Sequence, residues 1–373
     1  MAEPSPARRG RAPLPAGVVL PATHSGSQAM TTTMDTTSAA IAPRFGLIER
    51  LLRIVWIGPA IAALLIYLFF VIVGGASGFF SLPGTAGWLN TAAELGIIAL
   101  PIGLLMIAGE FDLSTGSVVG AAAIIVALGT GFYRLPIELT MTLALLLGVG
   151  VGCFNAFLVN TTKLPSFIVT LASNFILAGT SLGLSRLISG SSNVSIKDAG
   201  WAEYVLGSKW NFFNVSVLWY FLAIVLAAWV LKQTRFGNWI FATGGNPDAA
   251  RRAGVPVARV KLILFIWTAV SAAFVGIMSA VMYNQGNAAQ GQGYVFQTAI
   301  AAVIGGVLLQ GGFGSVIGIV LGTFIYGIVS LGLFYTGWPT DWLATFIGGL
   351  LVIAVLTNNL IRELALNRGK KKA

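Results

Sequence analysis

The sequence predicts an all-α protein, a polytopic bundle of about ten transmembrane helices, and three observations lead to this fold class. Of the 373 residues, 56% are hydrophobic and only 9% are charged, whereas about a quarter of an ordinary soluble domain is charged. Apolar segments follow one another along most of the chain. The 46 glycines suit close packing of helices in lipid. Most of the surface is therefore expected to face lipid.

Ten apolar segments supply the predicted spans. A helix needs about 20 predominantly apolar residues to cross the hydrocarbon core of a bilayer. Segments near this length lie at 54–75, 90–109, 115–133, 137–160, 165–187, 214–232, 259–283, 294–310, 313–332 and 340–358. They place a transmembrane domain at 46–360.

The two ends of the chain differ from this domain. Residues 1–45 are rich in Ala, Pro, Ser and Thr and lack sustained apolar periodicity, which predicts a disordered N-terminal tail. Residues 361–373 contain several lysines and arginines and are predicted to form a basic C-terminal tail.

Lysine and arginine positions predict how the chain crosses the membrane. Ten spans put both termini on the same side. If that side is the cytoplasm, the basic residues left outside are Arg134, Arg186, Lys197 and Lys209. Because basic residues concentrate on the cytoplasmic side of membrane proteins, both termini are predicted to be cytoplasmic. The net charge of +10 is then explained by topology, and no nucleic-acid partner is expected.

Few side chains could support metal or catalytic chemistry. The single cysteine, Cys153, lies in an apolar segment, and the single histidine, His24, lies in the predicted tail. A disulfide framework and a cysteine metal site are therefore excluded, as is a histidine-based metal site within the spans. A membrane-embedded enzyme would need clustered His, Asp or Glu. No catalytic residue and no metal site are predicted.

The largest predicted cytoplasmic connection contains the pattern of a short helix. Asn246 is a favourable N-cap residue, and Pro247 suits the first helical position. Asp248 complements the helix dipole, and Gly254 can adopt the left-handed conformation that ends a helix. Small residues on an exposed helix would offer a surface to another protein. The alternative is a plain connecting turn.

This connection resembles the cytoplasmic coupling segment of binding-protein-dependent ABC permeases of the ribose, xylose and galactose class. Three further segments resemble the same class in matching order, namely GEFDLSTGS at 109–117, LPSFIVTL at 164–171 and AIAAVIGG at 299–306. The resemblance covers roughly residues 50–365. Four motifs in order are more specific than any one of them.

The resemblance implies a type II importer-like permease in the bacterial inner membrane that moves a monosaccharide or related polyol inward. It implies four kinds of partner, namely ABC ATPase subunits, a periplasmic sugar-binding protein, a second permease copy forming a homodimer, and membrane lipid. The sequence lacks a Gly-x-x-x-x-Gly-Lys-Ser/Thr phosphate loop. The chain is therefore expected to be a transport subunit and not an enzyme, with no cofactor of its own, because ATP and Mg would bind the partner ATPase.

By the same resemblance, one segment would fit a groove on the ATPase and transmit its closure to the spans. The implied coupling residues are Gly244, Gly245, Asn246, Pro247, Asp248, Ala249, Ala250, Arg251 and Gly254.

Polar residues in or beside the spans are candidates for a translocation path. A carboxylate near the bilayer centre costs roughly 2.5–3.5 kcal/mol on insertion scales, so its presence needs a reason. Pro101 and nearby glycines are expected to interrupt the second span, and broken helices often mark transport routes. The candidates are Glu94, Glu110, Asp112, Ser114, Asn155, Asn174 and Gln297.

Five of these candidates also have a structural explanation. Glu110 and Asp112 also suit a hydrated loop in which Asp112 caps the third span. Asn155, Asn174 and Gln297 also suit hydrogen bonds between helices. Related permeases often carry acidic residues just after the tyrosine that opens the eighth span, where this chain has Val-Phe-Gln. The exact substrate therefore stays open, including a nucleoside or an autoinducer.

A secondary transporter or channel for small polar solutes is the alternative function. Coupling to an ion gradient usually relies on acidic, basic or histidine groups buried at mid-membrane. The sequence shows no convincing set of such groups.

A short internal similarity links the segments 109–120 and 311–318, both rich in Gly and Val. The match needs a four-residue gap and pairs spans six apart, which would make a parallel repeat. Internal repeats are frequent in transporters.

Overall fold

The computed structural model describes residues 56–370, without the side chains of Ala76 and of residues 358–370. The predicted tail at 1–45 therefore lies outside the described residues. The side chains of the predicted basic tail at 361–373 lie outside them as well.

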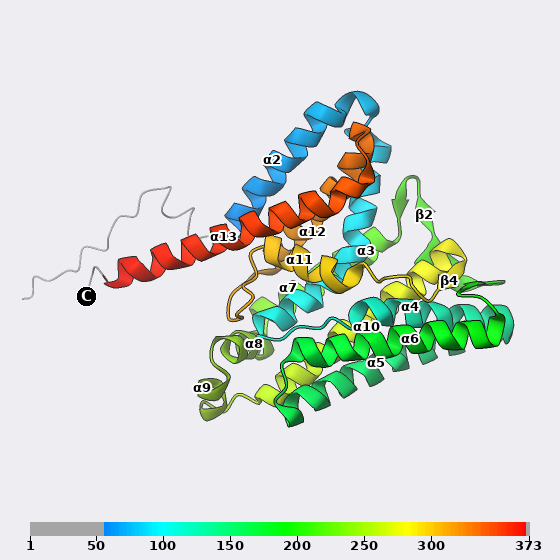
Figure 1. Cartoon of the computed structure of the whole chain (residues 1–373), viewed down its shortest axis with the longest axis horizontal. Coiled ribbons are helices and arrows are strands. Elements are labelled where there is room, and N and C mark those ends of the chain that lie inside the picture. The colour runs from blue at the N-terminus through cyan, green and yellow to red at the C-terminus, as the bar shows by residue number, and fades with distance from the viewer. Residues whose placement is uncertain (1–55, 371–373) are drawn as a thin grey trace, which may run out of the picture. The chain divides into compact units, whose positions relative to one another are not determined.

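The described chain is mostly helical (Figure 1). Three short helices are α8 (Arg235–Gly245), α9 (Pro247–Arg252) and α11 (Tyr294–Ile304). Single turns are η1 (Gly75–Ser77), η2 (Leu128–Phe132), η3 (Glu203–Gly207) and η4 (Thr340–Trp342). The longer helices are α2 (Ile57–Gly74), α3 (Leu82–Ile107), α4 (Thr115–Ala127), α5 (Ile137–Thr162), α6 (Ser166–Ser189), α7 (Ser216–Gln233), α10 (Val257–Tyr283), α12 (Val316–Thr336) and α13 (Leu343–Lys370).

The predicted all-α polytopic fold is confirmed. Within residues 56–370, nine helical segments are long and apolar enough to cross a membrane. They correspond to nine of the predicted spans. At the C-terminal end α13 continues to Lys370, so the predicted end of the last span at 358 is not the end of the helix.

The segment 294–310, predicted as one span, is not a continuous helix. Helix α11 has 11 residues, or roughly 16 Å at 1.5 Å per residue, about half of a hydrocarbon core. Glycines explain its end, because Gly305 is its C-cap residue and Gly306 has φ +89°. A Cβ on Gly305 would lie 2.2 Å from the carbonyl oxygen of Gly318 in α12. The helix therefore stops where the chain packs directly on another backbone.

Helix α3 also differs from expectation. It runs without interruption from Leu82 to Ile107 and contains Pro101, so the predicted break at this proline is wrong. A membrane helix can continue through a proline, kinked or straight, when neighbouring groups form hydrogen bonds with the backbone groups that the proline leaves unpaired. The actual break follows Ile107, where Gly109 has φ +87° and an irregular segment leads to α4.

Central and peripheral helices differ strongly in burial. In α3, and in the span formed by α4 with η2, 83% of the apolar window is buried, against 6% for the span Thr340–Thr357. Helix α10 packs against α5 and α4, while α12 packs against α3 and α2. The polar residues described below lie mostly on or beside the central helices.

Two small strand pairs join loops that are distant in sequence. Strand β1 (Asn193–Ser195) pairs antiparallel with β4 (Gln285–Asn287), with Val194 opposite Gly286. Strand β2 (Lys209–Trp210) pairs antiparallel with β3 (Phe213–Asn214). Strand β4 leads into the loop before α11, and β3 ends directly before α7. Both pairs therefore hold segments that border the candidate site.

Candidate functional site

A polar cleft lies between α3, α10 and α11. Its volume is about 270 Å³, close to the lower end of the range for small-molecule pockets. It brings together two sequence-predicted candidates, Glu94 and Gln297, which are far apart in the chain. The cleft is lined by Glu94, Ser279, Tyr283, Gln290, Gly291, Gly293, Tyr294 and Gln297.

Glu94 is the carboxylate of this cleft. It is half-buried on α3, and the side chains of Asn214 and Tyr294 hydrogen-bond to it. Asn214 is held in turn by Asn90, whose Oδ1 accepts from the Asn214 backbone N–H at 2.9 Å. A carboxyl group has two oxygens, each with two lone pairs, so Glu94 retains capacity for a hydroxyl group that enters the cleft.

Gln297 and the tyrosines give the cleft its other polar groups. Tyr283 ends α10, Tyr294 begins α11, and Gln297 lies one turn further along α11. A Cβ on Gly293 would lie 2.7 Å from Nε2 of Gln297. The glycine therefore leaves the space that this amide occupies. Sequence analysis missed the two tyrosines and Ser279, since single polar residues on an apolar helix carry no pattern that distinguishes them.

Asp112 and Ser114 belong to a different place, a buried hydrogen-bond network. Asp112 is 2% exposed. Its Oδ1 accepts from the backbone N–H of Ser114 at 2.9 Å and from the Ser114 hydroxyl at 2.6 Å. Its Oδ2 accepts from the Thr268 hydroxyl of α10 at 2.5 Å. The carboxylate thus fastens the irregular segment after α3 to α10.

Asn155 and Asn174 extend this network to α5 and α6. Asn155 donates through Nδ2 to the Ser114 hydroxyl at 2.9 Å and accepts from the Ser173 hydroxyl at 2.6 Å. Asn174 accepts from the backbone N–H of Ser117 at 3.2 Å. None of these residues lines the cleft. Their part in a translocation path stays a prediction, and their contacts are those of helix-to-helix attachment.

Sequence analysis also missed the residues of α6 that complete the network. The hydroxyl of Ser166 accepts from the backbone N–H of Phe111 at 2.9 Å, and that of Thr170 accepts from Leu113 at 3.0 Å. The two hydroxyls are four residues apart and so share one face of α6. This spacing, inside the motif at 164–171, is the signal from which the contact could have been inferred.

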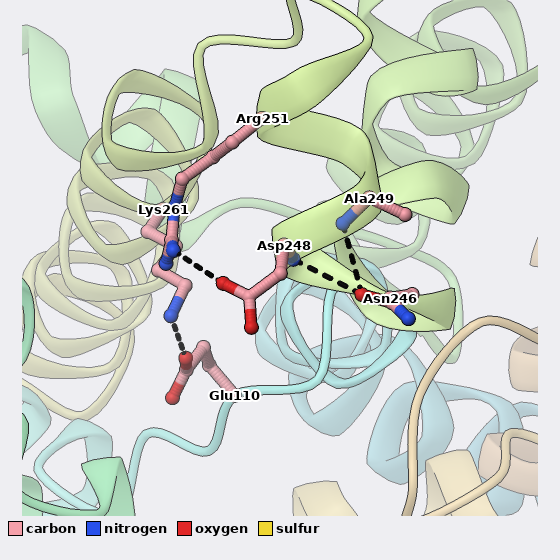
Figure 2. Close-up of polar contacts among 6 residues, drawn as sticks. All are labelled: Glu110, Asn246, Asp248, Ala249, Arg251 and Lys261. Carbon is pink, nitrogen blue, oxygen red and sulfur yellow. Dashed lines mark hydrogen bonds and ion pairs between the residues drawn. The ribbon is translucent and has the colours of Figure 1, made fainter. Parts of the chain in front are cut away.

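The predicted cytoplasmic helix is present as α9. Asn246 caps it, with Oδ1 accepting from the backbone N–H groups of Asp248 at 3.1 Å and Ala249 at 3.0 Å (Figure 2). Pro247 is its first residue. Arg251 and Asp248 form an exposed ion pair at 2.6 Å. Gly254 has φ +84° and follows the C-cap residue Ala253.

One of the implied coupling residues, Ala250, faces the protein and not the solvent. Ala250 is 5% exposed, so it packs against the protein itself, whereas Ala249 is exposed. The expectation that the small residues of this helix, Ala249 and Ala250, offer a surface to another protein is therefore wrong for Ala250. The reason is helix geometry, since adjacent residues point about 100° apart. Gly245, Asn246, Pro247, Asp248, Ala249, Arg251 and Gly254 are exposed, and Gly244 is half-buried.

Glu110 lies beside this helix rather than in the cleft. It forms an ion pair with Lys261 near the start of α10, and the two side chains are 12% and 14% exposed. Figure 2 shows this pair next to the pair that Asp248 makes with Arg251. The segment after α3 is therefore tied to α10 at Glu110 and again at Asp112.

Comparisons with known proteins show the family. Residues 84–355 match the family model described as branched-chain amino acid transport system / permease component. The galactose/methyl galactoside import permease protein MglC of Salmonella typhimurium is 32% identical over 316 residues, which cover 80% of this chain and 93% of that protein. The probable ABC transporter permease protein YphD of Escherichia coli is 32% identical over 307 residues, which cover 82% and 90%.

A third relative widens the range of transported solutes. The autoinducer 2 import system permease protein LsrD of Enterobacter sp. is 33% identical over 274 residues, covering 71% of this chain and 81% of that protein. No solved structure matches the chain. The expected resemblance is confirmed by the family model and by these relatives, and it agrees with the apolar helices of the described residues. The chain thus belongs to the permease components of ABC transporters and is a multi-pass protein of the inner membrane.

Proposed function

We propose that this chain forms the transmembrane path of a bacterial ABC importer for a neutral, hydroxyl-rich solute, a monosaccharide or related polyol. The observation that carries the proposal is the cleft that brings Glu94, Tyr294 and Gln297 together. Carboxylate, phenol and amide groups supply both acceptors and donors for sugar hydroxyls. The galactose import relative supports the same class of solute.

The charge of the cleft favours neutral solutes over anions. Its lining contains the carboxylate of Glu94 and no lysine, arginine or histidine. A negatively charged solute would lose hydration without gaining an opposite charge, which is costly away from water. Sugar acids and sugar phosphates are therefore expected to be poor substrates.

The exposed face of α9 supports one of the proposed partners. Its charged and capped residues form a surface suited to a second protein, and we assign this surface to an ABC ATPase subunit that carries ATP and Mg. A periplasmic binding protein would deliver the solute from the other side. A second copy of this chain would complete the path as a homodimer, so ATP hydrolysis takes place on the ATPase and not on this chain.

The course of the chain supports cytoplasmic termini. The segment 284–312 starts at the Tyr283 end of α10 and reaches the Ile107 end of α3, where Gly312 donates a backbone hydrogen bond to Ile107 at 2.7 Å. A short helix and an irregular segment together thus take the place of the eighth predicted span, at 294–310. Ten crossings leave both ends of the chain on one side, and the positive-inside rule selects the cytoplasm for it.

Reconstitution tests the proposal against a secondary transporter. The permease, its ATPase and its binding protein are placed in liposomes, and uptake of radiolabelled galactose is measured with and without ATP. Uptake that needs both partners and ATP supports the proposal, with autoinducer 2 as the alternative solute. Uptake by the permease alone, driven by an ion gradient, would overturn it.

A pair of substitutions locates the ATPase contact. Ala249→Glu adds a charge to the exposed face of α9, and we expect it to abolish co-purification of the ATPase. Ala258→Glu, at another exposed alanine after α9, is the matched control and should leave the complex intact. A substitution at Ala250 would test folding instead, because that side chain is buried. Equal ATPase binding by both variants would remove α9 from the contact.

A further inference from the structure

Three backbone segments meet without side chains between them beside α9. They are the end of α3, the end of α8, and the loop between α11 and α12. The glycines at the meeting point are Gly109, Gly244, Gly311 and Gly312, and we name this group the glycine junction. The backbone N–H of Gly312 donates to the carbonyl oxygen of Ile107 at 2.7 Å.

The junction has no room for larger residues. A Cβ on Gly244 would lie 1.8 Å from the Ile107 carbonyl oxygen and 2.6 Å from the Gly312 nitrogen. A Cβ on Gly311 would lie 2.8 Å from the Cα of Gly109. Gly311 and Gly312 also have φ values of +80° and +75°, which side chains disfavour. The three segments are therefore in direct backbone contact.

Each segment leads to a part of the molecule that the proposed function uses. Gly244 lies two residues before Asn246, the N-cap of α9. Helix α3 runs unbroken from the junction back to Glu94. The loop with Gly311 and Gly312 follows α11, which carries Tyr294 and Gln297. The junction thus connects the proposed ATPase surface with two walls of the cleft.

The two similar segments noted in the sequence meet at the same point. The segments 109–120 and 311–318 each begin with glycine after a helix has ended, and each leads into the next helix, α4 or α12. The would-be Cβ contact from Gly311 to Gly109 shows that the two glycines lie against each other. The two similar segments therefore touch each other, and each connects one helix with the next.

We propose that the glycine junction transmits the displacement of α9 to α3 and α11 together, with Gly244 as the positioning residue. Close-packed backbones move as a unit, because no flexible side chain can absorb the shift. Movement of α9 would then shift Glu94 on α3 and Gln297 on α11 together, relative to Tyr283 at the end of α10. This inference rests on the proposed function, in which an ATPase acts on α9.

Two glycine substitutions provide the test. Gly244→Ala places a methyl group against the Ile107 carbonyl, whereas nothing lies within 4 Å of a Cβ on Gly179 in α6. In the reconstituted complex we expect Gly244→Ala to keep ATPase binding and ATP hydrolysis within twofold of the unmodified protein, with solute uptake at least tenfold lower. Gly179→Ala should keep all three within twofold.

The outcomes separate this inference from the function on which it rests. If the unmodified permease binds no ATPase, the proposed function fails. If it couples uptake to ATP and Gly244→Ala couples equally well, the junction has no transmitting role and the inference is overturned. A loss of uptake with retained hydrolysis is a result that misfolding alone would not produce.

A second comparison decides the matter if Gly244→Ala does not assemble. Ile107→Ala removes a buried side chain that lies against Gly314, two residues after Gly312, and Ile328→Ala removes another buried side chain, from α12. A thiol introduced in the cleft by Gln290→Cys, with Cys153→Ser, reports ATP-dependent movement through its labelling rate. We expect Ile107→Ala to abolish an ATP-dependent change that Ile328→Ala preserves. Equal changes in the two variants would overturn the inference.

Discussion

Glu94 and Asp112 are carboxylates close together in sequence, yet they lie in contrasting surroundings. Asp112 is almost fully buried and accepts three hydrogen bonds from Ser114 and Thr268. Glu94 is half-buried, accepts from Asn214 and Tyr294, and borders an open cleft. A polar residue among membrane helices is therefore a candidate for solute contact only when its internal partners leave part of it free. Three substitutions test this contrast.

Asp112→Ala should cause the greatest change, a loss of stability. Removing the carboxylate leaves the buried backbone N–H and hydroxyl of Ser114 without their acceptor, and each unpaired buried group costs roughly 1–3 kcal/mol. We expect the thermal unfolding midpoint in detergent to fall by more than about 4 °C, given that ~1 kcal/mol moves it by about 2–4 °C in domains of roughly 150–250 residues. Asp112→Asn keeps one acceptor oxygen and should lose less. A midpoint unchanged in both variants would contradict a structural role.

Glu94→Gln should affect transport more than stability. The amide preserves size but loses the charged acceptor, and hydrogen bonds to charged groups contribute about 1.5–3 kcal/mol. We expect uptake of a neutral hexose to fall about tenfold, equivalent to ~1.4 kcal/mol, with little change in the unfolding midpoint. Uptake of the corresponding uronic acid should rise relative to the hexose. Unchanged uptake of both solutes would remove Glu94 from the path.

Gly293→Ala has the smallest expected effect and examines Gln297 alone. The added methyl group would meet the Gln297 amide at the cleft, so the side chain must turn away. We expect a two- to threefold drop in uptake, the size of a change of roughly 0.5 kcal/mol. Gly183→Ala, where nothing lies within 4 Å of the new Cβ, is the matched control. Identical uptake by the two variants would show that Gln297 does not contact the solute.

Local features of α9 could be predicted from the sequence. The cap at Asn246, the proline at 247 and the left-handed glycine at 254 were predicted from a few adjacent residues, and α9 has each of them. Capping depends on nearby backbone groups, so a short window of sequence contains the information. The burial of Ala250 was not predictable in this way, because it depends on which face of α9 meets the rest of the chain.

The seven candidates for the translocation path could be named from the sequence, but the sequence could not predict which of them lie together. Glu94 and Gln297 reach the cleft, Asp112, Ser114, Asn155 and Asn174 form the buried network, and Glu110 pairs with Lys261 beside α9. These partners are distant in sequence, as with Asp112 and Thr268, and nothing in a local pattern joins them. The residues that complete each site, such as Tyr283 and Thr170, were missed for the same reason.

The amino-acid sequence alone was enough to infer the lipid surroundings and the fold class, because long apolar segments with few charges must satisfy their own backbone groups and exclude water. The family was inferred from four motifs in matching order. Three features became apparent only in the folded protein, namely the short helix with an irregular end at 294–310, the continuation of α3 through Pro101, and the meeting of the glycines at 109, 244 and 311. These features depend on contacts between segments far apart in the chain. The residues of one segment alone do not predict the energies of such contacts.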